Sequence, residues 1–159
     1  MADRAATDQS QVVVFTLDEP RYALELSVVE RVVRAVDITP LPRAPEVILG
    51  VINVQGQIVP VVDIRKRMRL PARELTVDDL FILARTSSRL VALVVDAVVG
   101  VRNLVQSEMV SAEQIVPSAG YISGMAKLAD GVVLICDLDE FLSPVEERML
   151  DQKRRPERV

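Results

Sequence analysis

The stretch GVINVQGQIVPVVDIR, residues 50–65, decides the fold of this chain. Apolar residues run on both sides of Gln55-Gly56, and glycine accepts the positive φ that a tight hairpin turn needs. Pro60 has no N–H to donate, so its strand either is a sheet edge or turns that position away from a neighbour. Asp63 ends the second run and is placed to cap the turn IRKR. The stretch therefore predicts a β-hairpin that leads into a capped turn.

The same pattern recurs later in the chain. Gly50 and Asp63 are thirteen residues apart, and so are Gly124 and Asp137. Each pair encloses an apolar run, a turn that contains glycine and a second apolar run. The second copy predicts another hairpin that turns at Asp130-Gly131.

A second internal match has the same order. The apolar positions of residues 22–32 correspond to those of residues 91–101. Two matches in one order indicate two similar units. We therefore predict a mainly all-β fold: two similar five-stranded β-barrels packed together, with short helices and a C-terminal helix.

The domain organisation follows from this repeat. We expect residues 1–10 to be a disordered lead-in and residues 11–145 to form the β domain. The first barrel would span about 11–70 and the second about 79–145, with some strands exchanged. Residues 105–120 are predicted to be a polar connector, and residues 146–159 a helix and tail. Asp137 and Glu140 have the spacing of a capping box.

Composition excludes several functions. The 159-residue chain has a net charge of −4, which argues against a nucleic-acid partner. Its two basic runs, 65–69 and 153–155, are short, and we expect them to be solvated. The chain has no histidine, which removes the commonest general base and metal ligand. The single cysteine, Cys136, is predicted to be a small core residue.

Three carboxylates, Asp63, Asp96 and Asp137, each follow an apolar strand. Carboxylates at strand ends could form the acid and base of a hydrolase. They are more often turn formers or helix caps, and Asp63 and Asp137 occupy equivalent places in the repeat. We predict no enzymatic activity, no cofactor and no metal. The scattered aromatic residues are expected to lie in the core, not on a stacking surface.

The hydrophobic segments do not predict membrane insertion. The first ten residues have no apolar core, which argues against a signal peptide. The longest apolar run, 90–101, contains Asp96 and is too short to span a bilayer. We therefore expect a cytoplasmic protein with no direct membrane insertion.

Two segments carry a family resemblance. VVFTLDEPRYALELSVVERVVR, followed by ITPLPRAPEVILGVINVQGQIVPVVDIRKRM, resembles the CheW family of chemotaxis coupling proteins. RLVALVVDAVVGV and YISGMAKLADGVVLICDLDEFL in the second half are similar too. The resemblance covers residues 11–145 and implies an adaptor of two five-stranded barrels. Its partners would be the regulatory domain of a CheA-type histidine kinase and the cytoplasmic tip of methyl-accepting chemoreceptors, in arrays at the inner membrane.

The resemblance also implies which residues contact each partner. The kinase-facing positions map onto Arg31, Gly50, Gln55 and Gly56. The receptor-facing groove maps onto seven apolar positions, for which a core role is the alternative: Val29, Ile58, Leu80, Phe81, Ala92, Val98 and Val101. Relatives usually carry arginine at the position of Gln55 and often an acid at that of Arg31. An alternative function is therefore a scaffold with altered or lost kinase coupling in a non-flagellar, chemosensory-like pathway.

Overall fold

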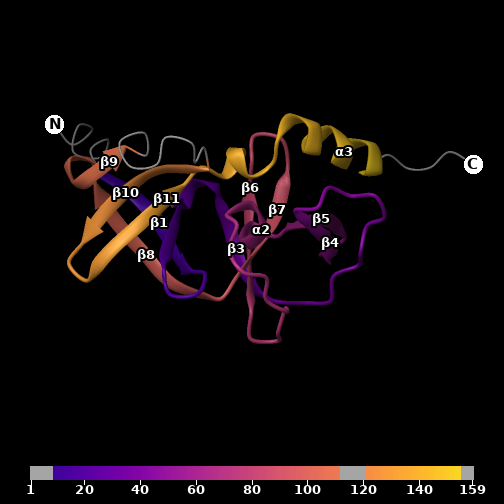
Figure 1. The fold of residues 1–159 in the computed structure, drawn as a ribbon, viewed down its shortest axis with the longest axis horizontal. Helices are drawn as coiled ribbons and strands as arrows, with labels where there is room; N and C mark the ends of the chain where they lie inside the picture. Colours follow the sequence, from indigo (N-terminus) through magenta and orange to yellow (C-terminus); the bar gives the residue numbers. More distant parts are fainter. Residues whose placement is uncertain (1–8, 112–120, 155–159) are drawn as a thin grey trace, which may run out of the picture.

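The fold consists of two β-sheets with short helical segments between and beside them (Figure 1). The computed structural model describes residues 9–111 and 121–154. Figure 1 shows one sheet on the left, the other on the right, and helix α3 (Pro144–Arg154) over the right-hand sheet. The predicted all-β class is confirmed. Residues 1–8 of the expected lead-in, 112–120 of the connector and 155–159 of the tail lie outside the described residues. The expected lead-in ran to residue 10, but Gln9 and Ser10 belong to a strand, so that part of the prediction was wrong.

Sheet A is six-stranded. Its strands are β1 (Gln9–Thr16), β2 (Arg21–Glu25), β8 (Ala97–Val105), β9 (Met109–Ser111), β10 (Ile122–Leu128) and β11 (Gly131–Cys136). Their order in the sheet is β8-β1-β2-β11-β10-β9. The β2–β11 pair is parallel, and the other neighbours are antiparallel. Strand β9 lies in the segment that the sequence predicted to be a connector, so that part of the prediction was wrong.

Sheet B is five-stranded. Its strands are β3 (Val29–Arg34), β4 (Ile48–Val54), β5 (Gln57–Val62), β6 (Leu80–Arg85) and β7 (Leu90–Val95). Their order is β3-β6-β7-β5-β4, and β5 and β7 form the parallel pair. In each sheet the single parallel pair thus joins two hairpins: β1–β2 to β10–β11 in sheet A, and β6–β7 to β4–β5 in sheet B.

The two sheets do not follow the two halves of the sequence. Strands β1 and β2 join four strands of the second half, while β6 and β7 join three strands of the first half. Both strand orders are open within the described residues, so the prediction of two closed five-stranded barrels was wrong in this detail. The edges are β8 and β9 in sheet A, and β3 and β4 in sheet B.

The hairpin of the opening stretch is confirmed. Val54 pairs with Gln57, which places the turn at Gln55-Gly56. Strand β5 lies between β4 and β7, so Pro60 is not on an edge strand. Its β4 partner, Val51, exchanges both of its backbone hydrogen bonds with Thr39 on the other side. Pro60 is therefore at a position of the β4–β5 ladder that needs no N–H.

The second hairpin is also confirmed, with a shift of one residue. Leu128 pairs with Gly131, so the turn residues are Ala129 and Asp130. Gly131 opens strand β11 and has a φ of 141°. A positive φ at this place explains why glycine follows the turn.

Short helices follow both hairpins. Asp63 caps α2 (Ile64–Arg67) by accepting a hydrogen bond from the Lys66 N–H at 3.2 Å, as predicted. Asp137 caps the 3-10 turn η4 (Leu138–Phe141).

The predicted capping box at Asp137 and Glu140 was wrong. Asp137 accepts from the Asp139 N–H at 3.1 Å instead. The capping box belongs to Ser143 and Glu146 at the start of α3, where each side chain accepts from the other residue's N–H. The sequence S-P-V-E has the spacing of this motif, so the signal was present six residues after the predicted cap at Asp137.

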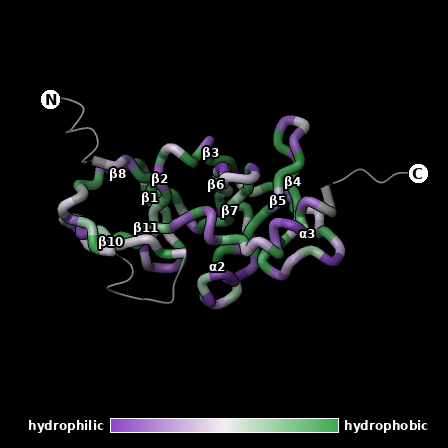
Figure 2. Tube along the Cα trace, turned by 90° about the horizontal axis from the view of Figure 1, so that it is seen from above, coloured by the Kyte–Doolittle hydropathy of each residue, from purple (hydrophilic) through white to green (hydrophobic). Residues whose placement is uncertain are grey.

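The core has three clusters. The largest contains residues of both sheets, including Phe15 and Leu24 from sheet A and Ile82 and Leu93 from sheet B. The second belongs to sheet A and the third to sheet B. Figure 2 shows the hydrophobic colour along the strands and the hydrophilic colour mostly in the loops. Among the described residues, no helix has the length and apolar character needed to cross a membrane.

Candidate functional site

The β4–β5 turn holds an exposed glutamine, Gln55, in a strained backbone conformation. Gln55 and Gly56 have φ values of 52° and 88°, and both residues are exposed. Positive φ at both positions is the signature of a type I′ hairpin turn. Asn53 stabilises the turn, because its Oδ1 accepts a hydrogen bond from the Gly56 N–H at 2.8 Å. A glutamine at positive φ is unfavourable for folding, which makes the position a candidate for function.

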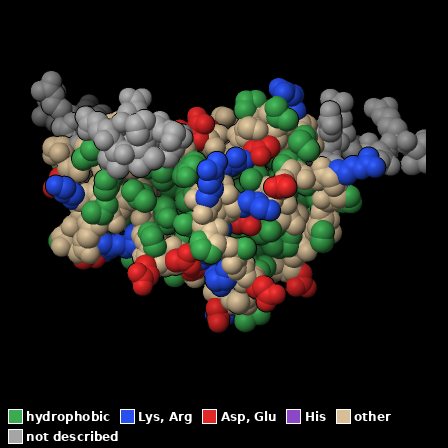
Figure 3. Space-filling view, in the orientation of Figure 1, with side chains coloured by type: hydrophobic (Ala, Val, Ile, Leu, Met, Phe, Trp, Pro, Cys, Tyr) green, Lys and Arg blue, Asp and Glu red, His purple; other side chains and the backbone are tan. Residues whose placement is uncertain are grey.

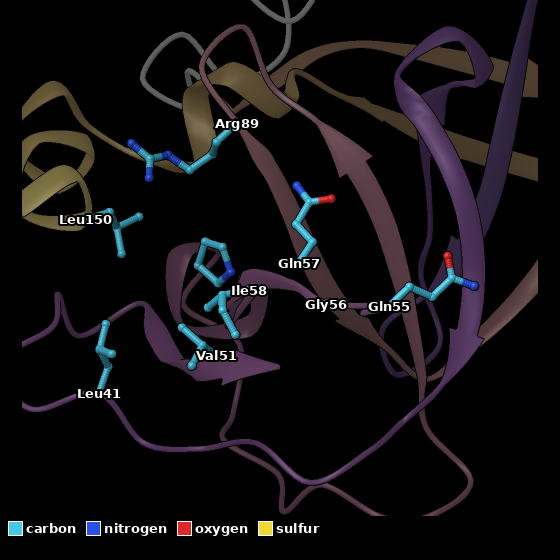
Figure 4. Close-up of a pocket in the computed structure, with 9 residues that line it drawn as sticks. Leu41, Val51, Gln55, Gly56, Gln57, Ile58, Arg89 and Leu150 are labelled. Atoms are coloured by element: carbon cyan, nitrogen blue, oxygen red, sulfur yellow. The ribbon is translucent and has the colours of Figure 1, made fainter. Parts of the chain in front are cut away.

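A pocket of about 700 Å³ opens beside this turn. The β4–β5 hairpin supplies most of its wall, and Leu41, Arg89 and Leu150 supply the rest (Figure 4). Its apolar lining residues are Leu41, Val51, Ile58, Pro60 and Leu150. Such a concave, mainly apolar surface with a few polar groups is suited to binding an apolar side chain of a partner.

Arg89 connects this pocket to α3. Its Nε donates to Glu147 Oε1 at 2.7 Å, and its Nη2 donates to Asp151 Oδ1 at 2.5 Å and to the Glu147 carbonyl at 3.2 Å. Arg89 is only 3% exposed, and Nη1 has no hydrogen-bond partner among the described residues. Leu150, on the same helix, is 2% exposed and faces the pocket in Figure 4.

The four residues predicted to face a kinase do not lie at one place. Gln55 and Gly56 form the exposed turn, while Arg31 is exposed on β3, at the opposite edge of sheet B. Strands β6 and β7 lie between β3 and β5, so β3 and β5 are three strand spacings apart, or about 14 Å measured across the strands. Gly50 is buried, and a Cβ there would clash with the Thr39 carbonyl oxygen. Its burial argues against direct contact, so we assign Gly50 a role in the fold.

The seven positions predicted to line a receptor groove also separate. Phe81 and Ala92 are 0% exposed and belong to the core of sheet B. Their burial agrees with the core role that was the alternative for these positions and argues against a direct receptor contact. Ile58 is 50% exposed and lines the pocket beside Gln55, so it groups with the kinase-facing positions instead.

The remaining four positions lie around the central core. Val29, Leu80 and Val98 are partly buried and pack against the cluster that joins the two sheets. Val101 is 53% exposed. Val99 and Val105 on the same edge strand, β8, and Val32 on the edge strand β3 are exposed as well. Exposed aliphatic residues at the edges of both sheets are available for contact with a partner.

The three strand-end carboxylates have structural partners. Asp63 and Asp137 are caps. Asp96 accepts hydrogen bonds from Arg65 at 2.8 Å, Arg73 at 2.5 Å and the Asp18 N–H at 2.6 Å. Burial raises the pKa of Asp96, but these donors outweigh it and lower the pKa below its usual value. A carboxylate held ionised in this way is unsuited to the acid–base pair that the sequence left open.

The Arg65 side chain is not solvated, contrary to the prediction for its basic run. Arg65 is 8% exposed and also contacts Asp18 at 2.7 and 3.1 Å. These contacts connect α2 to the β1–β2 turn and to the end of β7. On the face of the molecule seen in Figure 3, basic and acidic side chains are mixed over the centre, with hydrophobic side chains on both sides.

Cys136 is a core residue, as predicted. It is 4% exposed, and burial raises the pKa of its thiol to about 12. The thiol is therefore protonated at neutral pH and is a poor nucleophile. Within residues 9–111 and 121–154, no three cysteine or carboxylate side chains gather in a way that could hold a metal ion.

Sequence reasoning missed Arg89 and Leu150. Arg89 was not among the predicted site residues, and Leu150 lay in the predicted helix and tail. The contacts of Arg89 with Glu147 and Asp151 span 58 and 62 residues. No local pattern reports a contact over that distance. The S-P-V-E cap was the available signal that a helix begins at Pro144.

The fold and the surfaces define a two-sheet β protein that exposes aliphatic residues on its strand edges and a turn with positive φ on one hairpin. Residues 11–146 match the family model described as the CheW-like domain. The chain therefore belongs to the CheW-like family. The recognition made from the sequence is confirmed.

Individual relatives agree with this assignment. The chain is 25% identical to the chemotaxis protein CheW of Treponema pallidum (strain Nichols), over 90% of this chain and 88% of that protein. It is 28% identical to the chemotaxis protein CheW of Rhizobium meliloti (strain 1021), over 87% and 90%. The crystal structure of the scaffolding protein TtCheW from Thermoanaerobacter tengcongensis superposes with a TM-score of 0.81. It is 31% identical and is matched over 89% of this chain and 97% of that one.

Proposed function

We propose that this protein is a non-enzymatic adaptor that couples chemoreceptors to a CheA-type histidine kinase in a chemosensory array. The family match over residues 11–146 carries the proposal, and a solved relative is itself described as a scaffolding protein. The partners would be the kinase's regulatory domain and the cytoplasmic receptor tip. An adaptor with these partners would act in the cytoplasm, at receptor arrays beneath the inner membrane.

The receptor contact would use the apolar residues near the β3 and β8 edges. Val29, Leu80 and Val98 pack on the core between the sheets, and Val101 is exposed three residues after Val98 on β8. A helical receptor tip can place an apolar face on such a surface. Val101 is the best position for a test, because its exposure lets it change without opening the core.

The test replaces Val101 by glutamate. Val101→Glu should weaken binding of a receptor cytoplasmic fragment about tenfold or more, because a charge would be buried in an apolar contact. Val132→Glu is the matched control, since Val132 is 46% exposed on β11. Equal affinities for Val101→Glu and the unaltered chain, measured by titration of folded protein, would remove the receptor assignment.

The kinase contact would use the Gln55-Gly56 turn, with Arg31 as a second position. The two sites lie at opposite edges of sheet B, so any coupling between them has to pass through the bound kinase. A double-mutant cycle of Gln55→Arg and Arg31→Glu, titrated against a relative's kinase domain, measures that coupling. We expect the double variant to gain more affinity than the two single changes together. Additive effects would show that the positions act separately.

A second candidate function is a scaffold with altered or lost kinase coupling. Gln55 favours it, because the family resemblance implies arginine at this position. Binding of the unaltered chain to its own organism's CheA-type kinase separates the two candidates. Tight binding supports the adaptor, whereas receptor binding without kinase binding supports the altered scaffold.

A further inference from the structure

The pocket beside the Gln55-Gly56 turn has one wall that comes from a helix. That wall is Leu150 of α3, a helix from the end of the chain. The other lining residues come from the β4–β5 hairpin, the connector before it and Arg89, which immediately precedes β7. The shape of the surface beside Gln55 therefore depends on whether α3 is docked.

Apolar and ionic contacts both dock α3, and the apolar contact comes from Leu150 in the central core cluster. Leu150 is buried, but Val145 is 56% exposed. The helix has eleven residues, and a helix of that length is marginal in water without tertiary contacts. Ion pairs also dock the helix: Arg89 binds Glu147 and Asp151, and Arg67 binds Glu146.

Arg89 is the central residue of this docking. Its side chain is 2% exposed, whereas the side chains of Glu147 and Asp151 are 21% and 65% exposed. A guanidinium this deeply buried needs its two carboxylates, because an uncompensated charge is unfavourable away from water. Without them, Arg89 could regain water only if α3 moved away and took Leu150 with it.

We infer that Arg89 is a positioning residue for the candidate kinase surface: through Glu147 and Asp151 it holds α3 so that Leu150 completes the pocket beside Gln55. This inference rests on the proposed function and adds a mechanism to it. The kinase would meet a preformed pocket only in molecules whose α3 is docked. Affinity for the kinase domain then falls in proportion to the docked fraction.

The test is a pair of double variants with equal charge change. Glu147→Gln with Asp151→Asn removes both negative charges that face Arg89 and leaves amide oxygens that can still accept a hydrogen bond. Glu140→Gln with Asp78→Asn is the control, because both carboxylates are exposed and make no side-chain hydrogen bond within the described residues. Two properties are measured: trypsin cleavage after Arg148, which lies on α3, and titration against the regulatory domain of the organism's CheA-type kinase.

The first variant should be cleaved faster after Arg148 and should bind the kinase domain about tenfold more weakly if one molecule in ten keeps α3 docked. The control should match the unaltered chain in both. Glu147→Asp with Asp151→Glu, which keeps the carboxylates, should restore most of the protection. Leu150→Ala should weaken kinase binding through the pocket wall, provided that circular dichroism shows a folded protein.

Each other result has a distinct meaning. Unchanged cleavage in the first variant would show that Arg89 does not hold the helix, and this overturns the inference whether or not a kinase binds. Faster cleavage with unchanged kinase affinity would overturn the link between α3 and the contact surface. If the unaltered chain fails to bind the kinase domain, the proposed function fails, and with it the inferred role in kinase binding.

Discussion

The β4–β5 and β10–β11 hairpins are two copies of one framework. Each has a register shift beside a glycine, at Gly50 and Gly124, and each ends in an aspartate cap. Each also pairs in parallel with a strand from the other half of the chain, β5 with β7 and β11 with β2. The thirteen-residue spacing found in the sequence is therefore the length of this framework.

The contacts after the caps are also related. Arg65 and Asp139 each stand two residues after the capping aspartate. Arg65 binds Asp18 in the turn between β1 and β2, and Asp139 accepts a hydrogen bond from the Ser87 N–H, between β6 and β7, at 2.7 Å. Each hairpin is thus tied to a turn of the other sheet, with a buried charge in one case and an exposed carboxylate in the other.

The two hairpins differ at their turns. Gln55 has a positive φ and projects beside the pocket, whereas Asp130 binds Arg21 at 3.0 Å. Positions that the copies share hold the fold together. Positions that differ between the copies are not needed for the shared framework and can contact a partner protein. Of the two turns, the Gln55 turn is the better candidate for such a contact, because Asp130 is already paired with Arg21.

The largest effect should come from the framework glycines. Gly50→Ala should lower the free energy of unfolding by about 3 kcal/mol or more, because the new Cβ would meet the Thr39 carbonyl and φ is 152°. Gly124→Ala should lower it by about 1–2 kcal/mol, since its Cβ would lie 2.9 Å from the Val110 oxygen without the unusual φ. Urea unfolding measures both.

Gly56→Ala is the control for this comparison. Its φ is 88°, but a Cβ would meet nothing within 4 Å. The loss should be about 1 kcal/mol from backbone strain alone. Equal losses at Gly50 and Gly56 would show that the approach of Thr39 does not determine the cost.

The next effect concerns the ties between the sheets. Asp96→Asn should destabilise the protein by about 2 kcal/mol, because Arg65 is buried and would lose one of its two carboxylates. Asp139→Asn should cost less than about 1 kcal/mol, since Asp139 is exposed. Thermal unfolding of the two variants gives the ranking, and a reversed order would contradict it.

The pH dependence gives a second measure of the same tie. The pKa of Asp96 is lower in the folded protein than the usual value. The ionised carboxylate therefore contributes its full stability above about pH 4, and this contribution decreases as pH falls through the folded pKa. The unaltered chain should lose more stability than Asp96→Asn between about pH 5 and pH 3. Parallel pH profiles would argue that Asp96 does not titrate as the structure implies.

The smallest effect should come from the turns. Gln55→Gly should raise stability by about 1 kcal/mol, because glycine adopts positive φ without strain. Ala129→Gly, in the second hairpin, should lower stability by about 0.5 kcal/mol, since Ala129 has no positive φ and glycine only adds freedom to the unfolded chain. Thermal unfolding should show a higher melting temperature for Gln55→Gly and a lower one for Ala129→Gly. A change of the same sign in both variants would show that the two turns do not differ in backbone strain.

The sequence by itself determined the hairpins, the repeat and the family. These are local features: alternating apolar residues, a glycine in each turn segment, and an aspartate thirteen residues after a glycine. The cap at Asp63 and the core positions of Phe15 and Cys136 followed from the same short-range rules, and the structure has all three.

The tertiary structure alone decided how the strands are shared and which side chains reach the surface. Two apolar runs with the same pattern can lie in a core or at an edge, so Phe81 is buried and Val101 is exposed. Arg65 is buried because Asp18 and Asp96 meet it from 47 and 31 residues away. The pocket beside Gln55 needs Arg89 and Leu150 as well. Burial and charge pairing depend on which distant segments pack together, and a local sequence pattern holds no record of that.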